Sequence, residues 1–498
     1  MSVWYDGWAP RLICLVGITV FILMAWAVSS DRRRFPWRIV LGGLLLQLLL
    51  AFLVLRTSGG RWVFDQIGDL FTAVMSNVEA GSGFLFATGN RTPIGDSLLA
   101  TFAFGVLPTV VFFSSLMSVL YHLGVMQRLV AGMAWVMRFT LGTSGPETLA
   151  AAANVFVGHT EAPLVVRPYL SSMSRSELMA MMTGGFATVT GGLLGAYAGM
   201  GIDIAHLLTA SVISAPAALL IAKVMVPESP SEKNVPESLS ERNVPESPSE
   251  KIVPELPSGK NVSAGTRATG EQGVTHVDEP ETDQLPDTSS PASLTTETTP
   301  PPVAKTLPRP DSPPVLDRQV NVIAAAVEGA GEGLKLALNV AAMLIAFLAL
   351  LALVDSGLAA LCRVGGWVDQ GGTPALSMGV LLGYVGWPLA WLLGIPPDEC
   401  AVAGRLIGLK TVANEFVAFQ ALGELRRDTP AALSERSAAV LTYALAGFSN
   451  FAAIGIQVGG IGGLAPDRKR DLAELGLRAM FGGLLACCIT GAVAGVML

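Results

Sequence analysis

Long apolar stretches restrict this chain more than any other feature of its sequence. Three of them are LICLVGITVFILMAWAV at 12–28, VLGGLLLQLLLAFLVL at 40–55 and LNVAAMLIAFLALLALV at 338–354, and several more follow. Stretches that approach 20 apolar residues are long enough to cross a lipid bilayer as helices. We therefore expect an all-α polytopic membrane protein, which excludes an ordinary soluble enzyme.

The first apolar stretch is expected to remain as a membrane span rather than to act as a signal peptide. The residues before it, MSVWYDGWAPR, are not a short basic segment, and no small-residue cleavage site follows. Basic residues in short loops favour the cytoplasmic side of a cell (inner) membrane. The basic clusters at 31–38 and 467–471 therefore place the N-terminus outside, although the arginines at 426–427 would then also lie outside.

The segment 226–318 differs in composition from the rest of the chain. It opens with the nine-residue repeat VPESPSEKN, VPESLSERN, VPESPSEKI, VPELPSGKN and continues rich in Pro, Ser, Thr and Glu. Its 16 acidic and 8 basic residues account for the net charge of −7 of the whole chain. Frequent proline and few apolar residues do not build a packed core. We expect a disordered cytoplasmic linker here.

The linker separates two halves whose polar motifs correspond. AANVFVGHTEAPL precedes GGFATVTGG in the first half, and VANEFVAFQAL precedes AGFSNFAAIG in the second. An odd number of crossings before a cytoplasmic linker would make the halves inverted repeats, which are typical of secondary transporters. The expected domains are the N-terminal helices with an interfacial segment, the first repeat, the linker and the second repeat, at 1–90, 91–225, 226–318 and 319–498.

A first re-entrant hairpin is expected at 145–170. Two apolar pieces, each too short to span a bilayer, are joined there by GHTEAP. Pro163 suits the first turn of a returning helix. Thr160 and Glu161 would then lie at a helix N-terminus, whose dipole favours an ionised carboxylate. Polar backbone at such a tip is tolerated where it lines a wet cavity.

A second hairpin is expected at about 375–422. Lys410 and Asn414 are four residues apart, which predicts one helical face, and Glu415 is adjacent. Ionisable residues inside a membrane are candidates for a functional site. The glycine-rich motifs that follow each hairpin have two open interpretations: close helix packing through small residues, or broken helices whose carbonyls and hydroxyls bind a cation.

Each candidate residue also has a purely structural explanation. Glu161 could pair with the arginine six residues later, and Glu415 could pair with Lys410. Asn154 could bridge the hairpin arms, and His159 could be an ordinary buried histidine. The five cysteines show no zinc or haem spacing, and no catalytic motif of a hydrolase or metalloprotease appears, so we expect no enzyme.

In these motifs the chain resembles the concentrative nucleoside transporters. The resemblance covers about 90–225 and 320–498 and is carried by ANVFVGHTEAPLVVRPY, TGGFATVTGG, GLKTVANEFVAF and AGFSNFAAIGIQ. It implies a homotrimer in which each protomer has eight transmembrane helices and two re-entrant hairpins. It also implies nucleoside import by sodium symport, through an elevator-like displacement of a transport domain, with no nucleic acid as partner.

The same resemblance implies roles for individual residues. The nucleobase would be bound by His159, Thr160, Glu161 and Leu193. The ribose would be bound by Glu415 and Asn450, in a pocket lined by Phe448. Sodium would be bound by the side chains of Asn154 and Thr188 and by the backbone carbonyls of Val157 and Val189.

The chemistry of these residues agrees with the implied roles. An ionised Glu415 accepts strong hydrogen bonds from hydroxyls, and oxygen ligands suit a hard cation such as sodium. Two positions depart from the family pattern: His159 replaces a glutamine and Ala453 replaces a serine. Nucleoside preference could therefore differ, and a proton carried by Glu161 or His159 is the alternative to sodium. A membrane sensor that binds nucleosides without transporting them is the other alternative.

Overall fold

The structure is a computed structural model that describes residues 7–86, 104, 107–159, 161–228, 321–368 and 374–498, and the structural statements below concern these residues. All but the first three positions of the expected linker, 226–318, lie outside them, so its disorder stays a prediction. The described chain is helical, apart from one isolated bridge between Val368 and Pro374.

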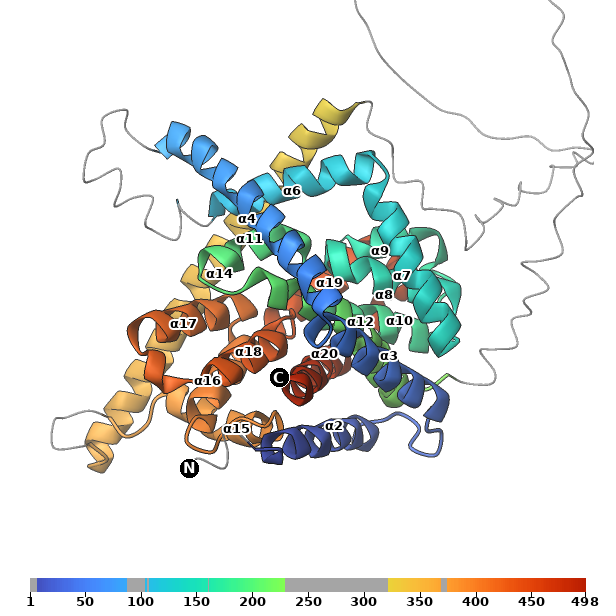
Figure 1. Cartoon of the computed structure of the whole chain (residues 1–498). Coiled ribbons are helices and arrows are strands. Elements are labelled where there is room, and N and C mark those ends of the chain that lie inside the picture. The colour runs from blue at the N-terminus through green and yellow to red at the C-terminus, as the bar shows by residue number, and fades with distance from the viewer. Residues whose placement is uncertain (1–6, 87–103, 105–106, 160, 229–320, 369–373) are drawn as a thin grey trace, which may run out of the picture. The chain divides into compact units, whose positions relative to one another are not determined.

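The two halves of the chain supply separate sets of helices (Figure 1). The first half contains α2 (Ala9–Ala27), α3 (Trp37–Leu55), α4 (Ser58–Phe86), α6 (Leu107–His122), α7 (Val125–Leu141), α8 (Gly145–Val157), α9 (Ala162–Val165), α10 (Arg175–Ala187), α11 (Gly191–Gly199) and α12 (Ile204–Met225). The second half contains α14 (Val322–Gly365), α15 (Met378–Leu392), α16 (Cys400–Val412), α17 (Glu415–Asp428), α18 (Glu435–Leu445), α19 (Phe451–Leu464) and α20 (Lys469–Met497). Short 3-10 turns are η2 (Arg167–Tyr169), η3 (Pro430–Ala432) and η4 (Pro466–Arg468).

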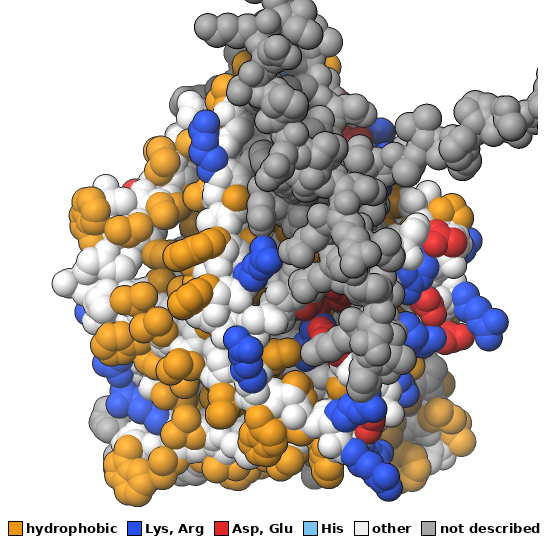
Figure 2. Space-filling view, turned by 90° about the vertical axis from the view of Figure 1, so that its right-hand side faces the viewer, with side chains coloured by type: hydrophobic (Ala, Val, Ile, Leu, Met, Phe, Trp, Pro, Cys, Tyr) orange, Lys and Arg blue, Asp and Glu red, His pale blue; other side chains and the backbone are white. Residues whose placement is uncertain are grey.

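Within the described ranges, five helical segments are long and apolar enough to cross a membrane: α2, α3, α12, α14 and η4 with α20. The helices α6 and α7 together form a sixth candidate that is bent by 77°. Along one side of α3, exposed leucine and phenylalanine side chains recur at helical spacing: Leu41, Leu45, Leu49 and Phe52. Figure 2 shows hydrophobic side chains spread over the left and lower parts of one face, whereas most acidic side chains and many basic ones gather toward its right-hand side. The expectation of a polytopic helical membrane protein is confirmed at this level.

Helix α20 forms the centre around which both halves pack. It contacts α2, α10, α12, α18 and α19, so it touches elements from each half. Small residues permit this close approach: a Cβ at Gly482 would lie 3.1 Å from the sulfur of Met225 and 3.3 Å from a Thr183 carbon. Gly483 faces Phe186 in the same way. Glycine-mediated packing of this kind is characteristic of membrane helices.

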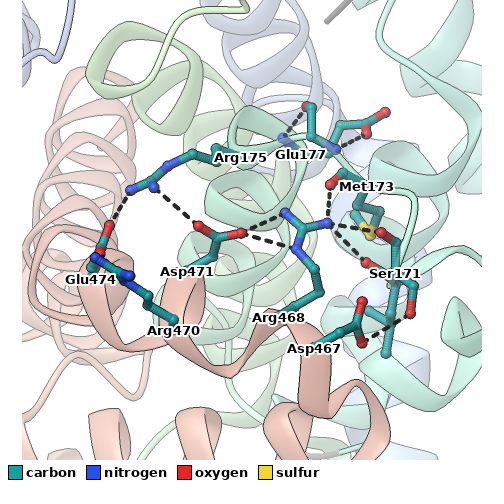
Figure 3. Close-up of polar contacts among 11 residues, drawn as sticks. Ser171, Met173, Arg175, Glu177, Asp467, Arg468, Arg470, Asp471 and Glu474 are labelled. Atoms are coloured by element: carbon teal, nitrogen blue, oxygen red, sulfur yellow. Dashed lines mark hydrogen bonds and ion pairs between the residues drawn. The ribbon is translucent and has the colours of Figure 1, made fainter. Parts of the chain in front are cut away.

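A polar cluster fastens the segment after α9 to the beginning of α20 (Figure 3). The Arg468 guanidinium donates to the backbone carbonyl oxygens of Ser171, at 3.1 Å, and of Met173. Arg175 bridges Asp471 at 3.0 Å and Glu474 at 2.9 Å. The segment 171–175, at the start of α10, is thereby joined to the start of α20, about 300 residues later in the sequence.

Helix α10 begins with a capping box, which fixes where this central helix starts. The Ser174 hydroxyl accepts a hydrogen bond from the Glu177 backbone nitrogen at 3.1 Å, and the Glu177 carboxylate accepts from the Ser174 nitrogen at 2.8 Å. The S-x-x-E spacing is visible in the sequence and satisfies two otherwise free backbone donors.

Candidate functional site

Two interrupted helices lie within the helical core. Residues 188–190 separate α10 from α11 and are called the first break here, and residues 446–450 separate α18 from α19 and are called the second break. The glycine-rich motifs had two interpretations, close helix packing and broken helices. The structure shows interrupted helical backbone at both motifs. A break leaves backbone groups free of helical hydrogen bonds, and in a membrane these line cavities that hold ions or solutes.

The two breaks lie next to each other. A Cβ at Gly447 would be 2.8 Å from the carbonyl oxygen of Phe186, at the end of α10, so glycine is required for this approach. The Cys487 thiol of α20 donates to the carbonyl oxygen of Ala446 at 3.3 Å and lies 3.7 Å from that of Ala187. The corresponding motifs of the two halves therefore meet in space.

Glu415 is the buried carboxylate beside the second break. It is the first residue of α17, and Asn414 caps this helix by accepting a hydrogen bond from the Val417 nitrogen at 2.9 Å. The Glu415 side chain is only 3% exposed and accepts from the Tyr197 hydroxyl at 3.1 Å and from the Asn450 amide at 3.3 Å. The positive end of the α17 dipole also favours the carboxylate.

Asn450 connects this carboxylate to the start of α19. Its side-chain oxygen accepts a hydrogen bond from the Ala453 nitrogen at 2.9 Å, while its amide group donates to Glu415. One side chain thus caps a helix and orients the acid. Ala453 is buried and, having no hydroxyl, offers no side-chain hydrogen bond here.

His159, between α8 and α9, brings the first hairpin segment to the second break. Its ring packs on Phe448 with ring centroids 4.6 Å apart. Both of its ring nitrogens are buried and lack a hydrogen-bond partner among the described residues. Gln457 of α19 and His159 both lie against Gly185 of α10. The Gln457 amide nitrogen donates to the Met182 carbonyl oxygen at 3.3 Å, and its side-chain oxygen has no partner in the described chain. Buried polar atoms without partners are uncommon in folded proteins, and a bound solute, ion or water is one explanation for them.

Oxygen atoms gather where α8 meets the end of α10. The amide nitrogen of Asn154 donates to the Met181 carbonyl oxygen at 3.3 Å, which leaves its side-chain oxygen without a partner in the described part of the chain. The Thr188 hydroxyl donates to the Gly184 carbonyl oxygen at 2.9 Å. Both side chains are fully buried. Their oxygens suit a hard monovalent cation.

The remaining residues of the two expected sets lie around the first break. The Val157 carbonyl oxygen accepts a hydrogen bond from the Thr190 hydroxyl at 3.3 Å, so the end of α8 touches the break. Val189 and Leu193 are buried. Thr160 lies outside the described residues.

Glu161 is placed differently from Glu415. It precedes α9 as expected, but its side chain is exposed, and no hydrogen bond or ion pair joins it to Glu415 or to Arg167 within the described residues. The first hairpin segment reaches the second break through His159 and Phe448 instead. A role for Glu161 at the base stays a prediction.

The expectation that Lys410 and Asn414 share one helical face is wrong. Helix α16 ends at Val412, and the extended backbone of Asn414 starts a new helix because its side chain caps the Val417 nitrogen. Lys410 consequently donates to the Ala444 carbonyl oxygen at 2.9 Å rather than to Glu415.

Sequence reasoning missed two polar side chains of this region, Tyr197 and Gln457. Tyr197 lies four residues after Leu193, which on a helix is the same face. Gln457 is a lone amide in an apolar stretch, which by itself marks a candidate inside a membrane. Both signals were available in the sequence.

These features define a class. A helical membrane protein whose interrupted helices surround a buried carboxylate and unpartnered polar atoms has the construction of a secondary transporter. Comparison with known proteins makes this specific: the chain belongs to the family of Na⁺-dependent nucleoside transporters.

Three family profiles match successive parts of the chain. They describe the N-terminus of the Na⁺-dependent nucleoside transporters at 16–88, a nucleoside recognition "Gate" at 103–203, and the transporter C-terminus at 286–495. An uncharacterized transporter of Haemophilus influenzae is 35% identical over 98% of both chains. Among solved structures, CNTnw in an inward-facing substrate-bound state matches with a TM-score of 0.75 and 34% identity, over 98% of each chain.

Animal relatives are longer. Sodium/nucleoside cotransporter 1 of Mus musculus is 37% identical over 98% of this chain but only 64% of its own length. Solute carrier family 28 member 3 of Eptatretus stoutii is 35% identical, with 61% of its length covered. The chain spans about three-fifths of these curated relatives.

Proposed function

We propose that this protein imports nucleosides by symport with sodium. The observation that carries the proposal is the buried Glu415 carboxylate, held by Tyr197 and Asn450 beside the second break. Phe448 of the same break packs on His159, whose ring nitrogens have no partner among the described residues. A nucleoside is neutral and carries two adjacent hydroxyls and a flat base. Its hydroxyls therefore suit the Glu415 carboxylate, which is a strong acceptor, and its base suits the His159 ring, which offers one donor and one acceptor.

Glu415 and Asn450 bind the ribose in this proposal, and Phe448 lines the pocket. Glu415 accepts from the ribose hydroxyls, and charge-assisted bonds of this kind are about twice as strong as neutral ones. The base lies against His159, Thr160, Glu161 and Leu193. Neutral His159 offers one donor and one acceptor, which sets a different base preference from that of an amide.

Sodium binds in this proposal between α8 and the first break. Its ligands are the side chains of Asn154 and Thr188 and the backbone carbonyls of Val157 and Val189. The side-chain oxygen of Asn154, which has no partner in the described part of the chain, supports this assignment. An ion at this corner would fix α8 against α10, next to His159. Sodium and nucleoside then favour the same conformation, and such coupling is reciprocal.

The inverted-repeat architecture is part of the same proposal. Helices α8 and α16 have equal length, and each is followed by a broken helix and then a long one, α12 or α20. The start of each is bound to the start of the following broken helix: Ser144 to Glu177 at 2.5 Å, and Ser434 to Glu399 at 3.1 Å. This parallel supports two repeats with re-entrant hairpins and eight transmembrane helices.

Further parts of the proposal concern assembly and placement. We place the protein as an elevator-type homotrimer in a cell (inner) membrane, with the N-terminus outside and the linker in the cytoplasm. Solved relatives in inward-facing, intermediate and outward-facing states support a moving transport domain.

Uptake into proteoliposomes tests the function directly. With a tenfold inward sodium gradient and the membrane potential held at zero, radiolabelled uridine or adenosine is expected to accumulate about tenfold if one sodium ion accompanies each nucleoside. Replacing sodium by choline should reduce uptake to the level of empty liposomes. Accumulation driven only by an acidic exterior would replace sodium by a proton. Binding without accumulation would show a sensor, and no uptake of any nucleoside under either gradient would reject the proposal.

Gly185→Ala is expected to lower nucleoside uptake by about tenfold. A Cβ there would lie 2.6 Å from the His159 Cβ and 2.8 Å from the Gln457 amide nitrogen. Overpacking of this kind costs about 1–3 kcal/mol and would displace His159 from Phe448. Gly455→Ala on α19 is the matched control, because a Cβ there meets nothing within 4 Å. Equal uptake by both variants would show that the position of His159 does not matter.

A further inference from the structure

Lys410 is a buried cation for which the proposed transport site has no use. Its side chain is fully buried in the last turn of α16, and its ammonium donates to the Ala444 carbonyl oxygen at 2.9 Å. A lysine inside a membrane protein is costly unless it is paired or functional. Its described hydrogen-bond partner is a neutral carbonyl, so an ion pair does not explain its presence.

Ala444 is the penultimate residue of α18, directly before the second break. The last four carbonyls of a helix lack intrahelical partners and form the negative end of its dipole. Cations stabilise such ends, and in transporters broken-helix C-termini are where coupling ions bind. Lys410 thus places a fixed positive charge on the kind of helix end that an ion would otherwise occupy.

Among the residues that the structure describes, no charged side chain is bound to the equivalent helix end in the first half. There, the described bonds to the last carbonyls of α10 come from the Thr188 hydroxyl, to Gly184, and from the Cys487 thiol, to Ala187. The α8 side chain that reaches α10 is Asn154, a neutral amide, at the Met181 carbonyl oxygen. In the second half the α16 side chain that reaches α18 is Lys410. The described contacts at the ends of α10 and α18 therefore differ by one lysine ammonium, that of Lys410 at α18.

We propose that the Lys410 ammonium is the internal counterpart of the transported sodium: it orders the second break permanently, whereas the first break is ordered only when sodium binds. Lys410 is then a positioning residue that acts through Asn450 and Glu415. The part that concerns sodium rests on the proposed function, but the part that concerns Lys410 does not.

Amide hydrogen exchange of the full-length protein in nanodiscs, without nucleoside, tests both parts. In the wild type, replacing sodium by choline should speed exchange in peptides covering 183–193 and leave those covering 442–453 unchanged. Lys410→Met should do the reverse and speed exchange at 442–453 by about tenfold, the order of a favourable charge–dipole contact. Lys223→Met, which removes a different buried lysine bound near the start of α10, should not single out 442–453.

The outcomes separate the two claims. If Lys410→Met leaves 442–453 as protected as in the wild type, the inference is wrong. The inference is also wrong if replacing sodium by choline speeds amide exchange at 442–453 as much as at 183–193. This comparison uses the wild-type protein, so it does not depend on the folding of a variant. Failure of choline to affect 183–193, with Lys410→Met acting as expected, would instead count against the sodium site and leave the role of Lys410 supported.

Discussion

Glu415→Gln is expected to reduce nucleoside uptake by about 100-fold while the protein still folds and assembles. A charged acceptor makes hydrogen bonds worth about 1.5–3 kcal/mol, against about 1 kcal/mol for a neutral one. Over two ribose hydroxyls the loss is therefore about 2–3 kcal/mol, which is on the order of 100-fold. The new amide would also present a donor to Tyr197 and Asn450, both of which donate to Glu415 in the structure.

Initial uptake rates in proteoliposomes give the measurement, and size-exclusion elution shows whether assembly is intact. Glu424→Gln is the matched control: it makes the same change on the same helix, at an exposed side chain bonded only to Gln420 among the described residues. Near-normal uptake by Glu415→Gln would remove this carboxylate from the binding site.

The second large effect concerns stability and involves Glu147, in the first turn of α8. Lys223 of α12 lies 2.5 Å from the Glu147 carboxylate, and the two side chains are 1% and 0% exposed. Lys223 also donates to the Ser176 hydroxyl at 3.1 Å. Removing one partner leaves a buried charge uncompensated, which costs about 3–5 kcal/mol. We expect Lys223→Met to destabilise the protein by that amount in denaturant titrations in micelles.

A double variant separates the ion pair from simple packing. Glu147→Gln keeps an acceptor for the Ser144 nitrogen, which Glu147 now binds at 2.7 Å, and removes the fully buried charge. The other carboxylate paired with Lys223, that of Glu228 at 2.8 Å, is 28% exposed and therefore in reach of solvent. Lys223→Met with Glu147→Gln should therefore recover most of the lost stability. Lys335→Met is the exposed control, since the Lys335–Glu332 pair is 76% and 61% exposed, and it should change stability by less than about 0.5 kcal/mol. A double variant no more stable than Lys223→Met would contradict this account.

Some of this protein could be predicted from its sequence because the signals are local. Apolar stretches near the length of a bilayer crossing predict membrane helices whatever surrounds them. Helix starts are local as well: Ser174 with Glu177 forms a capping box, and its S-x-x-E spacing stands in the sequence. The paired order of motifs in the two halves also placed Asn154, Glu415 and Asn450 in segments that the structure shows beside the breaks.

The positions of side chains around the breaks were decided only by tertiary structure. Periodicity relates residues along a continuous helix, and it put Lys410 and Asn414 on one face, but a break at 413 separates them. Tyr197 meets Glu415 across 218 residues of sequence, and His159 meets Phe448 from the opposite half. Backbone freed from one helix takes whatever partner the packing of distant helices supplies, and no local pattern in the sequence encodes that choice.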